Sequence, residues 1–248
     1  MTTYSFTPEA ISSPIQMHSR GRVFAIMVCA ESLWHPSIWS FLDELPTREE
    51  WWTIEPGDIV LDVGADFGSY TLSALAQGAG QVYAWSPPFK REDMPIEAFT
   101  LAKSANLNGW LDRLTLSMQG LWSESGYLAA FDGDRMAQFF RTQEEAIACI
   151  AEQPGHCATF AVCPLDVLAL TRVDWIKIDT EGAELAILTG GRETIARCRP
   201  RILLENHTHL DPDCEAKCTA FLAELGYRHV GTRPHHTISH SLYVPGEA

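Results

Sequence analysis

The chain has 248 residues, of which 46% are hydrophobic, and its 32 acidic against 18 basic side chains give a formal net charge of −14. This length supports one large α/β domain or two small ones, and the acidic balance excludes the overall basic character of a nucleic-acid-binding protein. The seven cysteines form no Cys-x-x-Cys pair, which argues against a disulfide framework or a zinc knuckle and favours a reduced, cytoplasmic setting.

The first 50 residues predict an N-terminal cap or extension. The apolar run at 23–30 is too short to span a bilayer, so it is interpreted as a strand and no membrane partner is expected. A helix is expected around 37–45. The main domain is predicted to occupy residues 51–248.

A βαβ unit opens the main domain. Residues 58–64 read as a continuous apolar strand, 69–78 as a helix that ends at a glycine, and 81–86 as a second strand. Such strands are typical of a parallel sheet that is covered on both faces. The alternation continues and predicts a doubly wound, mostly parallel sheet with an antiparallel edge. The further helices are expected at 96–109, 182–198 and 213–226, and the further strands at 113–122, 174–179, 200–207, 227–232 and 238–245.

Residues 134–153 interrupt this alternation. Apolar side chains recur there at helical spacing, which predicts one inserted helix. That helix either packs on the core or forms a lid or wall over a substrate. The side chains on its expected stripe are Met136, Phe139, Phe140, Ile147 and Ile150.

The turn "DVGADFGSY" at 62–70 is predicted to bind a nucleotide, because ligands of open α/β sheets sit beyond the carboxyl ends of the strands. Its glycines let the backbone approach a ligand, and the next helix offers free N–H groups. A tight turn that serves packing alone is the alternative. The spacing differs from the Gly-x-Gly-x-x-Gly of dinucleotide binders, which argues against NAD. The predicted cofactor-binding residues are Asp62, Gly64, Asp66, Gly68, Ser86 and Asp179.

Ser86 stands at the end of the second strand, where an acid usually binds the ribose hydroxyls. A serine can still accept a hydrogen bond, but the bond to this neutral group is weaker by roughly 1 kcal/mol.

"DWIKIDTEGAEL" at 174–185 places charges at alternate positions of an apolar strand. Asp179 lies at the carboxyl end of that strand, and His207 ends the next strand, so both are predicted to be catalytic, with one of them taking a proton from the acceptor. The alternative is structural: Lys177 pairs with a neighbouring acid, and Glu181 begins the next helix near its dipole. The predicted supporting residues are Lys177, Glu181 and Glu205.

Asp179, Glu181, Glu205 and His207 could also hold Mg²⁺ or a transition metal. Sequence alone fixes no coordination geometry, and no metal is included in the prediction. The histidines at 229, 235, 236 and 240 are expected at the surface or at an edge.

Several of these segments, in this order and spacing, resemble the FkbM-type S-adenosylmethionine-dependent methyltransferases over roughly residues 50–245. The most specific are "IKIDTEGAELAIL" and "RPRILLENH"; "DIVLDVGADFGSYTL", "VYAWSPP", "LAKSANLNG" and "PLDVLAL" also match. The resemblance implies a seven-stranded Rossmann-like methyltransferase fold, S-adenosylmethionine as cofactor and methyl transfer to a hydroxyl of a small molecule or sugar. That family typically has glutamate in an "FEP"-like motif where this chain has Trp85-Ser86-Pro87.

Two other functions stay open at this point. One is a dinucleotide-dependent oxidoreductase, which the glycine spacing and the missing acid disfavour. The other is a catalytically silent binding module that has lost the ribose contact at Ser86. The expected partner is a small-molecule or sugar acceptor, and the oligomeric state is left open.

Overall fold

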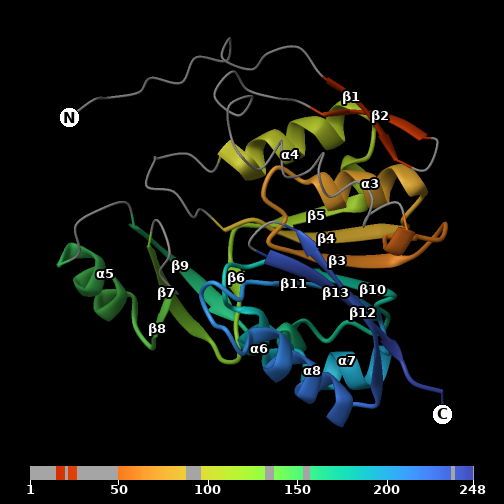
Figure 1. The fold of residues 1–248 in the computed structure, drawn as a ribbon. Coiled ribbons are helices and arrows are strands. Elements are labelled where there is room, and N and C mark those ends of the chain that lie inside the picture. The colour runs from red at the N-terminus through yellow and green to blue at the C-terminus, as the bar shows by residue number, and fades with distance from the viewer. Residues whose placement is uncertain are drawn as a thin grey trace.

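The computed structural model of the protein describes residues 15–19, 22–26, 50–87, 96–131, 137–152, 157–235 and 238–247. The strands of its central sheet are β3 (Ile59–Val63), β4 (Gln81–Trp85), β5 (Leu114–Ser117), β10 (Trp175–Ile178), β11 (Arg201–Asn206), β12 (Tyr227–His235) and β13 (Ile238–Pro245). They lie in the order β12-β13-β11-β10-β3-β4-β5 (Figure 1). The five strands from β11 to β5 are parallel, and β13 and β12 add an antiparallel edge. The predicted α/β class with a mostly parallel sheet is confirmed.

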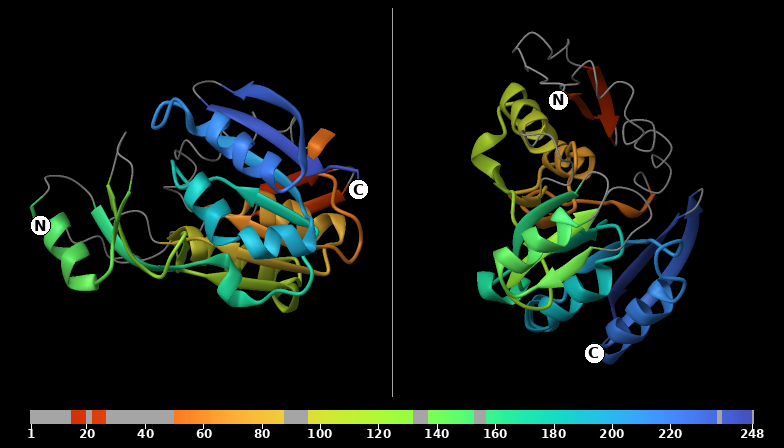
Figure 2. Two further views of the ribbon diagram at one scale, coloured as in Figure 1. Left: turned by 90° about the horizontal axis from the view of Figure 1, so that it is seen from below. Right: turned by 90° about the vertical axis from the view of Figure 1, so that its left-hand side faces the viewer.

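Helices cover both faces of this sheet. On one face lie α3 (Ser69–Gln77) and α4 (Ile96–Leu107), and on the other lie α6 (Glu184–Gly190), α7 (Arg192–Cys198) and α8 (Cys214–Glu224) (Figures 1 and 2). Two short 3₁₀ turns are η3 (Leu111–Arg113) and η4 (Leu165–Leu168). Among the described residues, no helix is long and apolar enough to cross a membrane.

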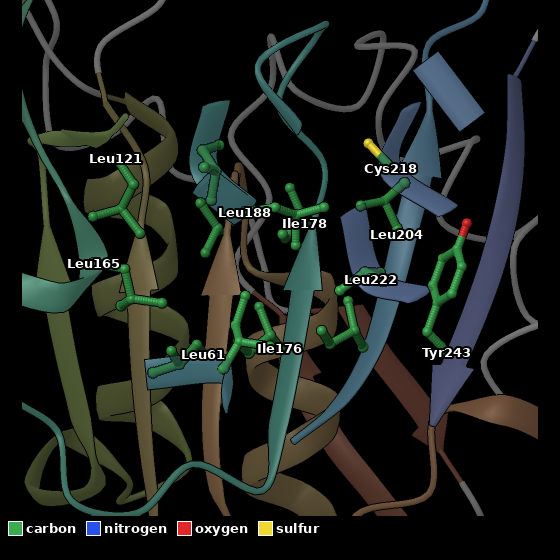
Figure 3. Packing of buried hydrophobic residues seen from close by; sticks show 14 of the residues in the cluster. Leu61, Leu121, Leu165, Ile176, Ile178, Leu188, Leu204, Cys218, Leu222 and Tyr243 are labelled. Carbon is green, nitrogen blue, oxygen red and sulfur yellow. The ribbon is translucent and has the colours of Figure 1, made fainter. Parts of the chain in front are cut away.

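The hydrophobic core has a part on each face of the central sheet, because successive side chains along a strand point to opposite faces. Ile176 joins the apolar cluster that includes α6 and α8, whereas its neighbour Trp175 joins the cluster that includes α3. Figure 3 shows Leu61, Ile176, Ile178 and Leu204 of three adjacent strands in the first cluster. Because both faces are covered, every residue of β10 is buried. This double covering explains why the strands read as continuous apolar runs.

A second sheet was not predicted. It contains β6 (Gly120–Leu121), β7 (Gly126–Phe131), β8 (Gln138–Phe140) and β9 (Cys157–Cys163) in the order β6-β9-β7-β8. Helix α5 (Gln143–Ala151) contacts β7, β8 and β9. Together these elements extend to one side of the central sheet (Figures 1 and 2).

The prediction of one helix over 134–153 is wrong in its first half. Phe139 and Phe140 lie in β8 and pair with β7, and Phe139 stacks on Trp122 with ring centroids 6.2 Å apart. The helix begins only after Thr142, whose side chain accepts a hydrogen bond from the Glu145 backbone N–H while the Glu145 side chain binds the Thr142 N–H. This capping box sets the start of the helix. Met136 lies outside the described residues.

Two further boundaries differ from the prediction. The strand expected at 113–122 is two strands, because β5 belongs to the central sheet and β6 to the second sheet. The helix expected at 182–198 is divided at Gly191 into α6 and α7. A Cβ at Gly191 would lie 2.9 Å from Leu165 Cδ2, so the absence of a side chain there lets Leu165 of η4 pack closely against this position.

The N-terminal hairpin consists of β1 (Ile15–Ser19) and β2 (Arg22–Ile26), which contact α3 and, in the case of β2, α4. The strand expected at 23–30 is confirmed as far as residue 26, and the helix expected around 37–45 lies outside the described residues. The domain boundary near residue 50 stays a prediction.

Candidate active site

Two neighbouring parallel strands bring charged side chains together at their carboxyl ends. Ile178 of β10 pairs with Leu204 of β11, so the residues that follow each strand emerge at the same edge of the sheet. The resulting group is called the strand-end cluster below. Its members are Lys177, Asp179, Glu181, Glu184, Glu205 and His207. All of them except Glu184 were predicted to be site residues.

Lys177 lies fully buried inside β10 and is compensated by acids. Its Nζ is 3.3 Å from Asp179 Oδ2 and 3.6 Å from Glu205 Oε2. The ammonium also lies 4.8 Å from the centroid of the Tyr70 ring on α3. A buried charge needs such partners. The structural alternative for Lys177, pairing with neighbouring acids, is therefore what the structure shows.

His207 is held by a carboxylate on one side and surrounded by carboxylates on the other. Its Nδ1 donates a hydrogen bond to Oε1 of Glu184, 2.7 Å away, and both side chains are buried. Its Nε2 lies 3.4 Å from Glu205 Oε1 and 3.7 Å from Asp179 Oδ1. The more exposed Glu181 places Oε2 3.5 Å from the same nitrogen. Glu184 thus fixes the ring so that Nε2 faces three carboxylates.

These contacts shift the pKa values of several side chains in the cluster. Burial lowers the pKa of His207, but the hydrogen bond to Glu184 and the charge of Asp179 outweigh it and raise this pKa to about 10. Burial raises the pKa of Asp179, but the charges of Lys177 and His207 outweigh it and lower that pKa below its ordinary value. Burial raises the pKa of Glu181. Perturbed groups gathered in one place are typical of functional sites.

The turn between β10 and α6 has an unusual backbone. Glu181 has φ 53° and Gly182 has φ 96°, so both adopt the left-handed conformation. This conformation is uncommon for a residue with a side chain, and strained residues of this kind tend to cluster at functional sites. The Gly182 N–H donates a hydrogen bond to Glu184 Oε1, 3.1 Å away. The turn therefore supports the same carboxylate oxygen that holds His207.

The glycine loop between β3 and α3 touches the strand-end cluster. Gly64 has φ +87°, and a Cβ placed on it would lie only 1.7 Å from the backbone oxygen of Asp179. The Asp179 N–H donates to the Val63 carbonyl, 2.9 Å away. The end of β3 and the end of β10 are therefore packed backbone to backbone.

A family model of the FkbM methyltransferase domain matches residues 62–229, which is more than half of the chain and contains both the glycine loop and the strand-end cluster. The chain belongs to the FkbM methyltransferase family. No significant match to a curated protein was found.

Two solved structures show the fold of this FkbM domain. One is the methyltransferase FkbM from Methylobacillus flagellatus KT, with a TM-score of 0.59, 16% identity and coverage of 82% of this chain and 47% of that one. The chain thus spans about half the length of that protein. The other is the putative methyltransferase yhhF from Escherichia coli, with a TM-score of 0.51, 10% identity and coverage of 95% and 100%. At these identities the likeness shows the Rossmann-like methyltransferase fold alone.

In the FkbM domain, protein atoms fill the space beside both loop glycines. The Asp179 carbonyl takes the space beside Gly64, and a Cβ on Gly68 would lie 2.2 Å from Leu101 Cδ1 on α4. Packing therefore accounts for both glycines, as the structural alternative held. Their contact with a cofactor stays a prediction.

The remaining predicted cofactor residues lie around the same loop. Asp62 is buried in β3 and accepts a hydrogen bond of 2.6 Å from the Thr71 hydroxyl. Burial raises the pKa of Asp62 to about 6, although this hydrogen bond lowers it. The Ser86 hydroxyl, at the end of β4, lies 3.4 Å from the Asp66 carbonyl oxygen. Ser86 and Asp66 are thus neighbours, and their roles toward a ligand stay predictions.

In the FkbM domain, the position expected for His240 is wrong. It was expected at the surface or at an edge, but it is fully buried. The register of β11 and β13 places it opposite Glu205, and its Nε2 lies 3.1 Å from Glu205 Oε2. His229 is partly buried and stacks on Tyr243 with centroids 4.9 Å apart, while the side chains of residues 235 and 236 lie outside the described part of the chain.

Glu184 was missed from sequence. An acid in the first turn of a helix is ordinary, because it stabilises the helix dipole. Only the packing of α6 against the end of β11 aims its carboxylate at His207. One signal for Glu184 was available in the sequence. Glu184 follows Glu181 by three residues, so both acids come just after the strand that was expected to end near His207.

An open hollow of about 680 Å³ lies elsewhere, on the second sheet. Phe139 and Phe140 of β8 and Cys149 of α5 are among its lining residues. None of the predicted site residues lines it. It is therefore separate from the strand-end cluster.

Proposed function

We propose that the protein is an S-adenosylmethionine-dependent O-methyltransferase that acts on a hydroxyl of a small molecule or sugar. Membership of the FkbM family supports methyl transfer. The observation that carries the rest is the contact between Gly64 and the Asp179 backbone. This contact places a loop suited to a nucleotide cofactor directly beside side chains suited to a hydroxyl group.

The residues around the glycine loop fit the cofactor. No side chain caps α3, whose N-cap is Gly68, so the first amides of this helix are not occupied by a cap. We assign the loop residues Gly64, Asp66 and Gly68 to the cofactor, with Ser86 at the ribose and Asp62 beneath the loop. S-adenosylmethionine would supply a methyl group on a sulfonium, which is already an activated leaving group. The negative excess of the strand-end cluster favours that positive charge.

Asp179 and His207 act on the acceptor in this proposal. They hold the acceptor hydroxyl at the carboxyl ends of β10 and β11, and its oxygen gains the methyl carbon as it loses a proton. Asp179, an ionised carboxylate, receives this proton, because the raised pKa of His207 keeps its imidazole protonated at neutral pH. Lys177, Glu181 and Glu205 keep the two side chains in place through the contacts described above. Because the methyl donor needs no further activation, alignment supplies much of the rate.

Calorimetric titration of the protein with S-adenosylmethionine, S-adenosylhomocysteine and NAD tests the proposal. We expect the first two to bind and NAD not to bind. Binding of NAD alone would indicate an oxidoreductase. Binding of none of the three would indicate a module that keeps the fold without the cofactor.

Ser86→Glu tests the assigned ribose contact. The new carboxylate would accept stronger, charge-assisted hydrogen bonds from the ribose hydroxyls. We therefore expect the affinity for S-adenosylmethionine to stay the same or to improve by at most about 1–2 kcal/mol, measured by calorimetry. The exposed Ser125→Glu is the matched control for the added charge. A tenfold loss of affinity in Ser86→Glu alone would contradict the assignment.

A cytoplasmic location and the absence of nucleic-acid and membrane partners also belong to the proposal. Five cysteines in the described part of the chain are free thiols, which supports a reducing compartment. They are Cys149, Cys163, Cys198, Cys214 and Cys218.

A further inference from the structure

We propose that Asp179, Glu205 and His207 form a binding site for one divalent cation that accepts both oxygen and nitrogen ligands, such as Mn²⁺. Each side chain offers one ligand atom, and these three atoms lie within 4.8 Å of one another. They come from the carboxyl ends of two adjacent parallel strands. The strands are buried in the sheet, so the ligands stand on a rigid base.

The spacing of the three atoms suits ligands better than hydrogen bonds. His207 Nε2 lies 3.4 Å from Glu205 Oε1 and 3.7 Å from Asp179 Oδ1. An N–H···O hydrogen bond is usually about 2.7–3.2 Å long. Two ligand atoms on one metal ion, each about 2.0–2.2 Å from it, lie about 2.9–3.6 Å apart, depending on the coordination angle. Small side-chain movements would bring all three atoms into that range.

Glu184 provides an independent indication. A histidine that binds a metal through one ring nitrogen usually donates the other N–H to a carboxylate, which orients the ring. His207 Nδ1 makes this contact with the buried Glu184 at 2.7 Å, and Nε2 is left facing Asp179 and Glu205. Glu184 is accordingly a positioning residue.

Charge also favours a cation at this point. Lys177 Nζ approaches Oδ2 of Asp179 and Oε2 of Glu205, so the other oxygen of each carboxylate is directed to His207. Four carboxylates, counting Glu181 and Glu184, face one ammonium and the two imidazoles of His207 and His240. The mixture of carboxylate and imidazole favours Mn²⁺ or a similar first-row ion over Mg²⁺, which prefers oxygen ligands alone.

The role of the ion rests on the proposed function, whereas the site itself does not. Two carboxylates and one imidazole leave coordination positions for water or for the acceptor oxygen. A bound ion would orient the acceptor hydroxyl beside the methyl donor. Asp179 would then be a ligand and would not receive the proton, which would pass to water.

The test is a titration of the chelator-treated full chain with MnCl₂. Binding is measured as the loss of the free Mn²⁺ signal in electron paramagnetic resonance. We expect one ion per chain, a higher melting temperature with Mn²⁺, and weaker binding of Mg²⁺. No binding at 1:1 stoichiometry below about 1 mM, or Mg²⁺ binding as tight as that of Mn²⁺, would overturn the site.

Variants assign the ligands. Glu205→Gln and His207→Gln should each weaken Mn²⁺ binding at least tenfold, and Glu184→Gln should weaken it about 10–100-fold. Glu224→Gln removes an exposed carboxylate that pairs with Arg192 and has no contact with the cluster, so it should bind Mn²⁺ as the unmodified chain does. Unchanged binding in Glu205→Gln and His207→Gln would overturn the assignment. If a variant does not fold, the titration of the unmodified chain still decides the proposal. Cofactor binding without Mn²⁺ binding would leave the proposed function standing and remove this inference.

Discussion

Gly64→Ala is expected to destabilise the protein by about 3–5 kcal/mol, because the added Cβ meets protein backbone in a conformation that disfavours any side chain. That Cβ would lie 1.7 Å from the Asp179 oxygen and 2.8 Å from the Asp179 carbonyl carbon, at φ +87°. Neither backbone segment can yield easily, since Val63 and Asp179 are joined by a hydrogen bond. Urea unfolding gives the free energy, and calorimetry should show that binding of S-adenosylmethionine is lost as well.

Gly57→Ala is the matched control for this effect. Gly57 has nearly the same conformation, φ +89°, but a Cβ there would meet nothing within 4 Å. Its substitution should therefore cost only the conformational strain, about 1–2 kcal/mol. The difference between the two variants isolates the steric contact between the glycine loop and the strand-end cluster. If both variants lost the same free energy of unfolding, the close contact at Gly64 would contribute nothing to the effect of its substitution.

Asp179→Asn should lower turnover by about 10²–10⁴-fold, the usual effect of removing a positioned catalytic group. The amide keeps the shape of the side chain and removes its charge, so neither a proton nor a cation is held as before. Lys177 keeps Glu205 as a partner at 3.6 Å, and the Asp179 side chain is 30% exposed. We therefore expect melting temperature and cofactor affinity to change little. Single-turnover methyl transfer from labelled S-adenosylmethionine measures the rate.

Asp112→Asn controls for a lost surface charge, because Asp112 is exposed in η3, outside the cluster. It should keep full turnover. The prediction for Asp179 fails if Asp179→Asn retains its rate per folded molecule. It also fails if the variant unfolds while the folded fraction turns over normally, because the charged strand end would then serve stability alone.

The sequence by itself determined the central sheet and the grouping of charged side chains at the ends of two of its strands. The strand at 58–64 was readable because a parallel sheet covered on both faces needs nearly continuous apolar runs, and β3 lies within it. The strand at 174–179 was readable from Trp175, Ile176 and Ile178, although charged residues stand between and beside them. The meeting of Asp179 with His207 was predictable because parallel neighbouring strands end at the same edge. Both inferences use only local pattern and the direction of the strands.

Only the tertiary structure decided how the site is held together. Glu184 reaches His207 because α6 packs against the end of β11, and His240 is buried because β13 pairs with that strand in a particular register. Phe139 and Phe140 show helical spacing, yet they form β8 because pairing with β7 and the capping box at Thr142 override that pattern. These contacts join residues distant in sequence or compete with a local preference, and their energies depend on packing that a pattern along the chain does not record.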